Sequence, residues 1–482
     1  MRIKLLIFIL AVFSFAITNL NAQDNNFYTG MEFNEEAYNA TPAPPLMLSR
    51  EYSAMPRTYS LKKYCPTPKN QGQQGSCVGW SSAYAARTIL YAKRKSMTNT
   101  AAITSIAFSP SYVYNQIKLS SDCTSGSYVN SAMEVLNNQG SPKLADHPYA
   151  CNQTITSTDK NKASKYKIKT YRRLSNTGAS TIDAVQKSIS EGNPVVIGMS
   201  VYSSFSYSKG VWSGVRDNFR GGHAMTIIGY DDNKYGGAFE LMNSWGATWG
   251  NGGFIWVKYS DMAINCKEYY EMVGFEVEKA KVDNVVVNPV DMQGSIKFVK
   301  SDKSTMYASL STSATRDFNI VKKEIFVVGS ESTYKLNKSQ ASGTEFRIYI
   351  ANNQPAYVYI IGYGTNSGKA AALYPFTGYS AYLGYKKNNV AIPNEDYYIQ
   401  LDNKTGKDYL CVLYSKNPLN ISKITAQIQN SNGRTFSDKV KEVLQSKLVD
   451  GSNVTFEKNN INFKAKSSGK SVIPIIVEFD HI

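Results

Sequence analysis

A cysteine that follows a glycine-rich and amide-rich loop is the first feature of this chain that could perform chemistry. Cys77 ends the run from Gln71 to Ser76, and small helix-forming residues such as Ala83 and Ala86 follow it. The pattern predicts a helix that begins at Cys77, where the helix dipole favours the thiolate form of the side chain. Gln71 lies six residues upstream, so a tight loop can return its side-chain amide to the oxygen that a Cys77 nucleophile would develop.

A base for this thiol can be chosen among the three histidines of the chain. His481 is the penultimate residue, and His147 lies in a turn-like segment before a proline. His223 instead follows a glycine pair and precedes a run of apolar residues that is typical of a strand. A histidine at the mouth of a strand can take the thiol proton and return it to a leaving amine. We therefore predict that His223 is the base.

A third polar segment follows His223 by about twenty residues. It contains Asn243, Ser244, Trp245 and Gly246, followed by a second Trp-Gly pair. The amide of Asn243 can accept a hydrogen bond from the far nitrogen of an imidazole, and Trp245 can shield that bond from water. Together, Cys77, His223 and Asn243 in this chain order indicate a thiol that performs acyl chemistry.

These three segments resemble the signature of the papain-like cysteine peptidases over roughly residues 57–275. The resemblance implies a cysteine-type peptidase, a hydrolase of the thiol protease class, with an α+β fold of two lobes, one helical and one β-barrel-like. It also implies a substrate groove at Gly75, Gly126 and Trp245. The chain departs from the family pattern in three places: Gln74 stands where the family has a cysteine, Val78 where it has an aromatic residue, and Ser125 where it has a second glycine.

The six cysteines allow several pairings. The family commonly has cross-links after the central helix, and this resemblance implies a bridge between Cys123 and Cys151. A second bridge, Cys65 with Cys266, would tie the start of the catalytic domain to its end. Cys411 lies in an apolar alternating run and is expected to be a buried thiol of the core.

The chain divides into four regions by composition and hydrophobic pattern. Residues 1–22 have the charged start and apolar core of a signal peptide, which predicts export to the periplasm or the extracellular space. Residues 23–56 form an irregular arm, which either covers the groove or packs as a structural tail. Residues 57–278 form the peptidase domain. Residues 279–482 show short alternating runs that predict a β-rich, sandwich-like domain with one helix over 437–447. This last region resembles an accessory domain of unassigned function found in many bacterial exported proteins.

The net charge of +16 raises the question of nucleic-acid binding. The basic residues are spread along the chain, so we expect no nucleic-acid partner, and no run after the signal peptide is long enough for a transmembrane segment. We expect no metal and no cofactor, and the partner of the accessory domain is unknown. Protein or peptide is the expected substrate. Two other functions remain open: a catalytically silent papain-like module that binds protein, and a thiol-dependent acyl transferase.

Overall fold

The computed structural model describes residues 27–45, 54–174, 178–274, 290–311, 326–328, 333–384 and 388–482. The predicted signal peptide and part of the predicted arm therefore lie outside the described residues. So does the predicted domain boundary between residues 275 and 289, and the boundary stays a prediction.

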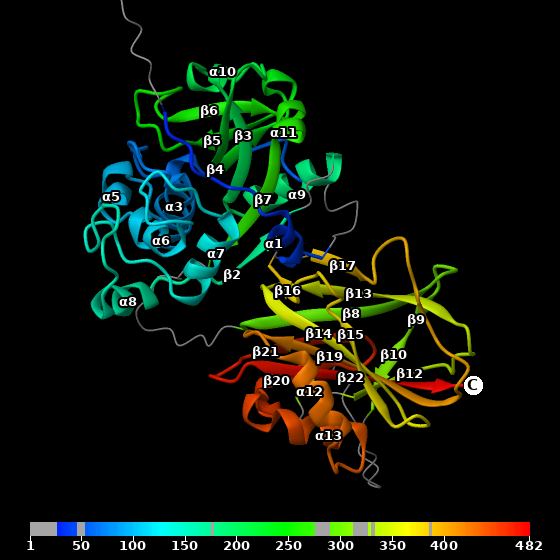
Figure 1. Ribbon diagram of the computed structural model, residues 1–482. Coiled ribbons are helices and arrows are strands. Elements are labelled where there is room, and N and C mark those ends of the chain that lie inside the picture. Colours follow the sequence, from blue (N-terminus) through cyan, green and yellow to red (C-terminus); the bar gives the residue numbers. More distant parts are fainter. Residues whose placement is uncertain are drawn as a thin grey trace, which may run out of the picture.

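A helical lobe follows the N-terminal arm (Figure 1). Its central helix runs without a break from Cys77 to Arg94, through an α-helical turn, a π-helical stretch and a second α-helical stretch, as the sequence predicts. Shorter helices pack around it, and their starts carry clear capping signals. Ser109 caps the helix that begins at Pro110, and Thr156 forms a capping box with Asp159. The helices are α3 (Cys77–Gly79), η2 (Trp80–Arg87), α4 (Thr88–Arg94), α5 (Thr100–Ser105), α6 (Pro110–Ile117), α7 (Val129–Asn138) and α8 (Ser157–Ser164).

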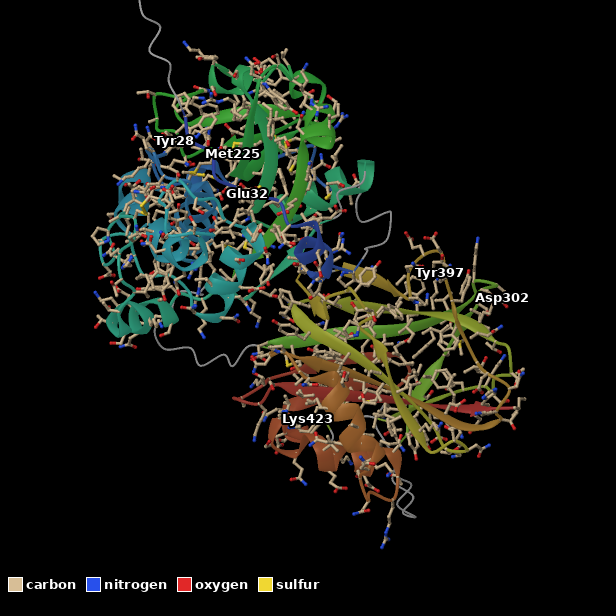
Figure 2. The ribbon with its side chains drawn as sticks, in the orientation of Figure 1. Tyr28, Glu32, Met225, Asp302, Tyr397 and Lys423 are labelled. Carbon is tan, nitrogen blue, oxygen red and sulfur yellow. A yellow bond between two sulfur atoms is a disulfide. The ribbon has the colours of Figure 1, made fainter. Side chains whose placement is uncertain are left out.

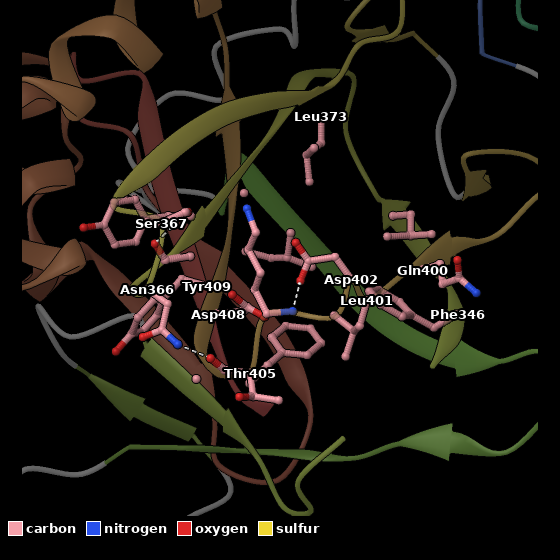
Figure 3. A pocket seen from close by; sticks show the side chains of 18 residues that line it. Phe346, Asn366, Ser367, Leu373, Gln400, Leu401, Asp402, Thr405, Asp408 and Tyr409 are labelled. Carbon is pink, nitrogen blue, oxygen red and sulfur yellow. Dashed lines mark hydrogen bonds between the residues drawn. The ribbon is translucent and has the colours of Figure 1, made fainter. Parts of the chain in front are cut away.

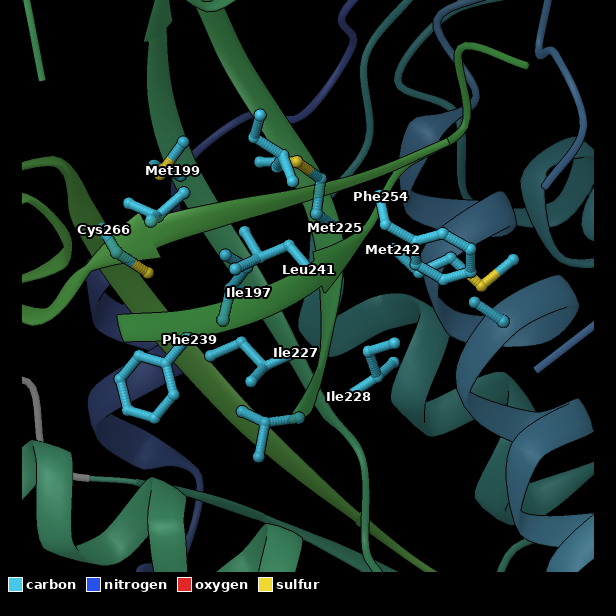
Figure 4. Packing of buried hydrophobic residues seen from close by; sticks show 14 of the residues in the cluster. Ile197, Met199, Met225, Ile227, Ile228, Phe239, Leu241, Met242, Phe254 and Cys266 are labelled. Carbon is cyan, nitrogen blue, oxygen red and sulfur yellow. The ribbon is translucent and has the colours of Figure 1, made fainter. Parts of the chain in front are cut away.

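A β lobe faces the helical lobe. Its seven-stranded sheet has the order β2-β7-β3-β4-β5-β6, with β1 paired to β4. Ile197, Met225, Ile227 and Leu241 pack in its core (Figure 4), which explains the long apolar runs of β3 and β4. The strands are β1 (Thr58–Ser60), β2 (Thr170–Arg173), β3 (Val195–Tyr202), β4 (Phe219–Asp231), β5 (Ala238–Met242), β6 (Phe254–Lys258) and β7 (Cys266–Val273). The shorter elements of this lobe are η1 (Lys62–Tyr64), α9 (Gly178–Ser190), α10 (Ser203–Ser206), η3 (Lys234–Gly236) and α11 (Tyr259–Asn265). The chain thus has the predicted α+β, two-lobe arrangement in this region.

The C-terminal region forms two further sheets. The first has the order β10-β12-β22-β19-β14-β15, and the second has the order β11-β20-β21-β8-β13-β17. Their inner faces share one apolar core, so the predicted sandwich-like domain is present. The strands are β8 (Met292–Lys300), β9 (Thr305–Met306), β10 (Ala308–Leu310), β11 (Phe326–Val328), β12 (Thr333–Leu336), β13 (Glu345–Asn352), β14 (Ala356–Gly364), β15 (Lys369–Tyr374), β16 (Tyr382–Leu383), β17 (Asn388–Ile392), β18 (Ile399–Gln400), β19 (Gly406–Ser415), β20 (Val454–Glu457), β21 (Ile461–Ala465) and β22 (Val472–His481).

Two helices cover the outer face of the first of these sheets. The expected helix is α13 (Phe436–Leu444), followed by the short turns η4 (Gln445–Lys447) and η5 (Gly451–Asn453). Sequence patterns missed α12 (Ile421–Gln429), because its β-branched and amide residues have low helix propensity. Ile424 and Ile428 of this helix bury one face against the sheet, and Asn420 caps its start. Cys411 lies in the same buried cluster as a free thiol, as predicted.

The arm and the β lobe both contact the C-terminal domain. Arg172 is buried and donates from Nη1 to the carbonyl of Tyr382, at 2.8 Å. Its guanidinium also forms an ion pair with the buried Glu271. Ala43 of the arm exchanges backbone hydrogen bonds with Gly378 and Ser380, each at 2.8 Å. The arm therefore contacts the accessory domain as well as the lobes.

Candidate active site

The thiol of Cys77 lies at the start of the central helix, where that helix meets the β lobe. Cys77 is fully buried, and the backbone N–H of Ala224 on β4 points to its Sγ atom at 3.5 Å. His223 immediately precedes Ala224 on β4, and its ring makes no hydrogen bond to the Cys77 thiol in this conformation. Burial raises the pKa of the Cys77 thiol to about 12, so the thiol is neutral in this conformation.

His223 is held by Asn243. The Nε2 atom of His223 lies 2.7 Å from Oδ1 of Asn243, and the same oxygen accepts from the backbone N–H of Ser244 at 2.7 Å. Because Oδ1 can only accept, Nε2 of His223 carries the proton and Nδ1 is left as the base. Among the residues that the structure describes, Nδ1 has no hydrogen-bond partner. Burial lowers the pKa of His223 to about 4, so the imidazole is also neutral here.

Trp245 covers the histidine, as the sequence predicts. Its ring stacks on that of His223, with a centroid distance of 4.6 Å and an interplanar angle of 26°. Phe27 of the arm also stacks on Trp245, at 4.8 Å and 13°. The indole N–H donates to the backbone carbonyl of Tyr28, at 2.9 Å. Trp245 therefore shields the bond between His223 and Asn243 and also binds a peptide backbone.

Gln71 is buried beside this group with its amide nitrogen directed at peptide carbonyls. Nε2 donates to the carbonyl of Thr29 in the arm at 3.2 Å and to that of Gln74 at 2.8 Å. Oε1 accepts from the hydroxyl of Ser244 at 2.7 Å. The expected oxyanion donor thus already binds a peptide carbonyl, and that carbonyl belongs to the chain's own N-terminal arm.

The arm occupies the space between the two lobes. In Figure 2, Tyr28 and Glu32 mark this segment where it passes from one end of the lobes to the other. Met31 forms an antiparallel bridge with Gly222 of the β lobe and a parallel bridge with Ser127 of the helical lobe. Glu32 donates to the carbonyl of Ser127 at 3.1 Å, and Ser127 donates to that of Gly30 at 2.9 Å. The arm therefore lies in the groove as an added strand, which is one of the two alternatives that the sequence left open.

The glycines predicted to bind substrate lie against this strand. A side chain on Gly30 of the arm would come within 2.4 Å of the backbone of Gly75, so the two chains approach as closely as glycine allows. A side chain on Gly126 would meet Glu32 at 2.9 Å. The backbone bridge is nevertheless made by Ser127 and not by Gly126. The arm thus pairs with the residue after Gly126, and the pairing of substrate with Gly126 stays a prediction.

One of the two predicted disulfides is present. Cys123 and Cys151 form a disulfide, and Cys123 accepts a backbone hydrogen bond from Gly75 at 2.9 Å. The pairing of Cys65 with Cys266 is wrong, because both are buried free thiols. Cys266 begins β7 opposite Met199, whereas Cys65 follows η1, which adjoins the far end of β4 near Ile228. One strand and several residues of register separate the two, which is more than a disulfide can span.

Two positioning residues were not predicted from the sequence. Ser244 bonds both Asn243 and Gln71, so it ties the support of the histidine to the oxyanion donor. The hydroxyl of Tyr149 donates to the carbonyl of Gln71 at 2.7 Å and lies 2.6 Å from that of Ser76. The position of Ser244 within the Asn-Ser-Trp-Gly segment was a signal for its role. Tyr149 lies far along the chain from the residues that it contacts, so spacing gives no such signal.

A second polar cluster lies in the C-terminal domain. The ring of His481 lies between Asp408, at 2.8 Å from Nδ1, and the hydroxyl of Ser342, at 3.0 Å from Nε2. Asp408 also lines a cavity of about 260 Å³ (Figure 3). The backbone N–H groups of Ser342 and Gly343 already donate to the carbonyls of Ile482 and Leu401. Neither of these two N–H groups is therefore free to bind an oxyanion, and the bonds of His481 fix the end of β22.

Within the described ranges, no group of histidine, cysteine and carboxylate side chains is arranged to hold a metal ion. The helices of the same ranges are all too short or too polar to cross a bilayer.

Comparison with known proteins gives two family matches. Residues 55–274 match the papain family of cysteine proteases, and residues 340–418 match a domain of unknown function, DUF4384. Cathepsin K from Mus musculus is 28% identical over 207 residues, which are 41% of this chain and 57% of that protein. Cysteine proteinase 3 from Entamoeba histolytica is 27% identical over 253 residues, or 50% of this chain and 77% of that protein. The chain thus spans little more than half of the length of cathepsin K.

Solved structures of cysteine proteases are also similar to this chain. Xylellain from Xylella fastidiosa has 20% sequence identity and a TM-score of 0.44, and the match covers 52% of this chain and 97% of xylellain. Bromelain from Ananas comosus has 22% identity and a TM-score of 0.37, over 46% of this chain and 100% of bromelain. In its sequence motifs, its two-lobe fold and its family match, the segment from residue 55 to residue 274, a little under half of the chain, is thus similar to the papain family of cysteine proteases.

Proposed function

We propose that this chain is an exported cysteine peptidase whose own N-terminal arm keeps it latent in the conformation described here. The observation that carries the proposal is the pairing of a peptide strand with both walls of the groove, with one carbonyl bound to Gln71 beside Cys77 and His223. Peptide substrate would pair with the same two walls. Export rests on the predicted signal peptide at residues 1–22, and the disulfide between Cys123 and Cys151 is consistent with it.

The proposed reaction starts when the arm leaves the groove. His223 Nδ1 takes the proton of the Cys77 thiol, and the thiolate attacks the peptide carbonyl. Gln71 and the backbone N–H of Cys77 stabilise the negative oxygen of the tetrahedral intermediate. The intermediate expels the amine, which takes the proton from His223 and leaves a thioester on Cys77. Water, deprotonated by His223, then hydrolyses the thioester and releases the acid and the thiol.

Gly30→Ala provides a direct test in the full chain. Gly30 has a φ of 134°, which L residues rarely adopt, and the added methyl group would lie 2.4 Å from the backbone of Gly75. We expect this variant to free the groove and to cleave a mixed peptide library, with cleavage sites identified by mass spectrometry. Gly236→Ala is the matched control, because Gly236 also has a positive φ but open space around it.

Cys77→Ala in the Gly30→Ala background completes the test. Cleavage that persists without the thiol would come from another source and would refute the proposal. Absence of cleavage in Gly30→Ala itself, together with full alkylation of Cys77, would favour a silent binding module instead. Transfer products in place of acids would favour an acyl transferase.

A further inference from the structure

The arm carries a short proline-rich segment after helix α1 (Glu35–Ala40). Residues 42–45 read Pro-Ala-Pro-Pro, and we call them the proline segment. Two prolines three residues apart are typical of extended peptides that dock in aromatic grooves as a polyproline II helix. Thr41, just before them, has φ −69° and ψ 129°, which is close to that conformation. Because proline has no N–H, Ala43 provides the only backbone donor of the segment.

The accessory domain binds the backbone of the proline segment. The N–H of Ala43 donates to the carbonyl of Gly378, and the carbonyl of Ala43 accepts from the N–H of Ser380, each at 2.8 Å. In the β lobe, the N–H of Arg173 on β2 donates to the carbonyl of Pro42, at 3.1 Å. The one donor of the proline segment is thus bound to the accessory domain, in the manner of an added strand.

An aromatic cleft of the accessory domain receives the last proline of the segment. A cavity of about 220 Å³ lies there, and the buried Pro45 forms part of its wall. Phe376, Tyr379 and Tyr397 line the same cavity, and these residues are 38%, 37% and 68% exposed. Large rings that surround one cavity at the surface of a domain mark an interaction site and not a core. Aromatic walls are also the surfaces on which proline-rich peptides dock.

Helix α1 connects this contact to the groove, and it lies where the two domains meet (Figure 1). It has six residues, which is too few for a stable helix by itself in water. Its start is held where the N–H of Asn34 donates to Oε1 of Glu268, at 2.9 Å, and its middle is held by the buried Tyr38. The proline segment holds its end. Loss of the contacts at this end should therefore lower the free energy that is needed to lift the arm out of the groove.

We propose that the accessory domain binds proline-rich extended peptide, and that its ligand in this chain is the proline segment of the arm. By holding this segment, the domain keeps the arm in the groove and sets how often Cys77 is uncovered. The accessory domain thereby regulates the catalytic site. This regulatory role rests on the proposed function, because it assumes that the covered groove is the latent one.

Alkylation of Cys77 by iodoacetamide tests the proposal in the full chain. Cys77 is fully buried in one cluster with Met31 of the arm, so its thiol can react only when the arm has left. Ala43→Pro removes the donor to Gly378 and places a ring at that carbonyl. We expect Cys77 in this variant to react about 5- to 10-fold faster, the scale of one lost hydrogen bond. Peptide mass spectrometry measures the rate at Cys77 separately from the other thiols.

Glu35→Pro is the matched control, because it places a proline at the first residue of α1, where a helix accepts one. It should react within about twofold of the parent rate. An unchanged rate in Ala43→Pro, or an equal acceleration in Glu35→Pro, would overturn the proposal.

A second pair of variants tests the aromatic cleft without adding a proline. Pro45→Ala and Tyr379→Ala should each speed alkylation at least about fourfold, the scale of one buried methylene group. The double variant should react no faster than the faster single variant, because both changes remove the same contact. Tyr307→Ala is the control, since Tyr307 is 63% exposed on the same domain and does not line the cavity. Full additivity of the two changes, or an equal effect of Tyr307→Ala, would contradict recognition of Pro45 by the cleft.

Cleavage of a mixed peptide library by the same variants separates this proposal from the peptidase function. Faster alkylation of Ala43→Pro without any cleavage would remove the peptidase function and leave the hold of the accessory domain on the arm standing. Cleavage by Gly30→Ala together with an unchanged alkylation rate in Ala43→Pro would do the reverse.

Discussion

At the scale of single residues, the site is a set of polar groups that each hold another in place. Asn243 fixes which nitrogen of His223 carries the proton, and Ser244 ties Asn243 to Gln71. Because Ser244 bonds both partners, a change at either one reaches the other. The roles of these residues can be separated by substitution in the Gly30→Ala chain, where the groove is open.

Four substitutions should rank in a defined order of turnover. Cys77→Ala and His223→Ala should each remove nearly all peptidase activity, because thiolate and imidazolium act as one unit. Gln71→Ala should lower turnover by about 100- to 1000-fold, the usual effect of losing one oxyanion donor. Asn243→Ala should be the mildest, since it only misorients the ring.

The rate of alkylation of Cys77 by iodoacetamide, measured beside peptide turnover, distinguishes these roles. Gln71→Ala should keep the thiol reactive, whereas His223→Ala should not. Full turnover in Gln71→Ala would show that the glutamine does not stabilise the oxyanion.

The buried acid Glu268 should give the covered protein a pH-dependent stability. Its pKa is about 7 in the fold and about 4.5 in the unfolded chain, so the folded protein binds more protons between these values. The free energy of unfolding should therefore fall as the pH rises from about 4.5 to 7, by on the order of 2–3 kcal/mol from this group. Glu268→Gln lacks this dependence and should melt at a higher temperature than the parent at pH 8. Equal melting temperatures at pH 8 would contradict the burial of a carboxylate at this position.

At the scale of elements, the loop after α6 carries one wall of the groove. A disulfide joins Cys123 in this loop to Cys151, which follows α7, with a sequence separation of 28 residues. Replacement of both cysteines by serine should lower the free energy of unfolding by about 3–4 kcal/mol, from the lost constraint on the unfolded chain. Urea denaturation of the full chain measures this. In the Gly30→Ala background, we expect loss of the disulfide to raise KM more than it lowers kcat. The reason is that Ser127 of this loop binds the peptide backbone in the groove, whereas Cys77 lies on the central helix. An unchanged denaturation midpoint would show that the bridge does not constrain the unfolded chain.

The residues proposed to be catalytic could be selected from the sequence because each lies in a short segment whose residues serve one local purpose. Gln71 and Cys77 share one loop, and Asn243 and Trp245 share another. Glu268 could not be found in this way, since it reads as one polar residue at the start of an alternating strand. Its buried position in the groove depends on Gly198 and Met31. These residues are distant in sequence and are brought together by the register of β3 and by the path of the arm. The false bridge between Cys65 and Cys266 failed for the same reason.

At the scale of the whole molecule, Arg172 links the two domains. It pairs with Glu271 inside the β lobe and donates to Tyr382 of the accessory domain. Arg172→Ala would leave the carboxylate of Glu271 buried without its partner, so we expect a loss of about 3–5 kcal/mol in stability. Glu271→Gln in addition should restore part of this loss, because it removes the stranded charge. Thermal denaturation of the single and double variants measures both effects, and a double variant less stable than Arg172→Ala would contradict the explanation.

The groove and the arm that fills it belong to one polypeptide, so the inhibition that we propose is intramolecular, and this determines its kinetics. Only Glu32 and Phe33 lie between Met31 in the groove and Asn34, which caps α1 (Glu35–Ala40), and the buried Tyr38 anchors that helix. So short a tether holds the inhibitor at an effective concentration in the millimolar range or above. Occupancy of the groove is then a unimolecular equilibrium that dilution does not shift. Once a single peptide bond between the groove and α1 is cut, the same residues become a separate molecule whose hold falls with its concentration, and activation by such a cut is irreversible in practice.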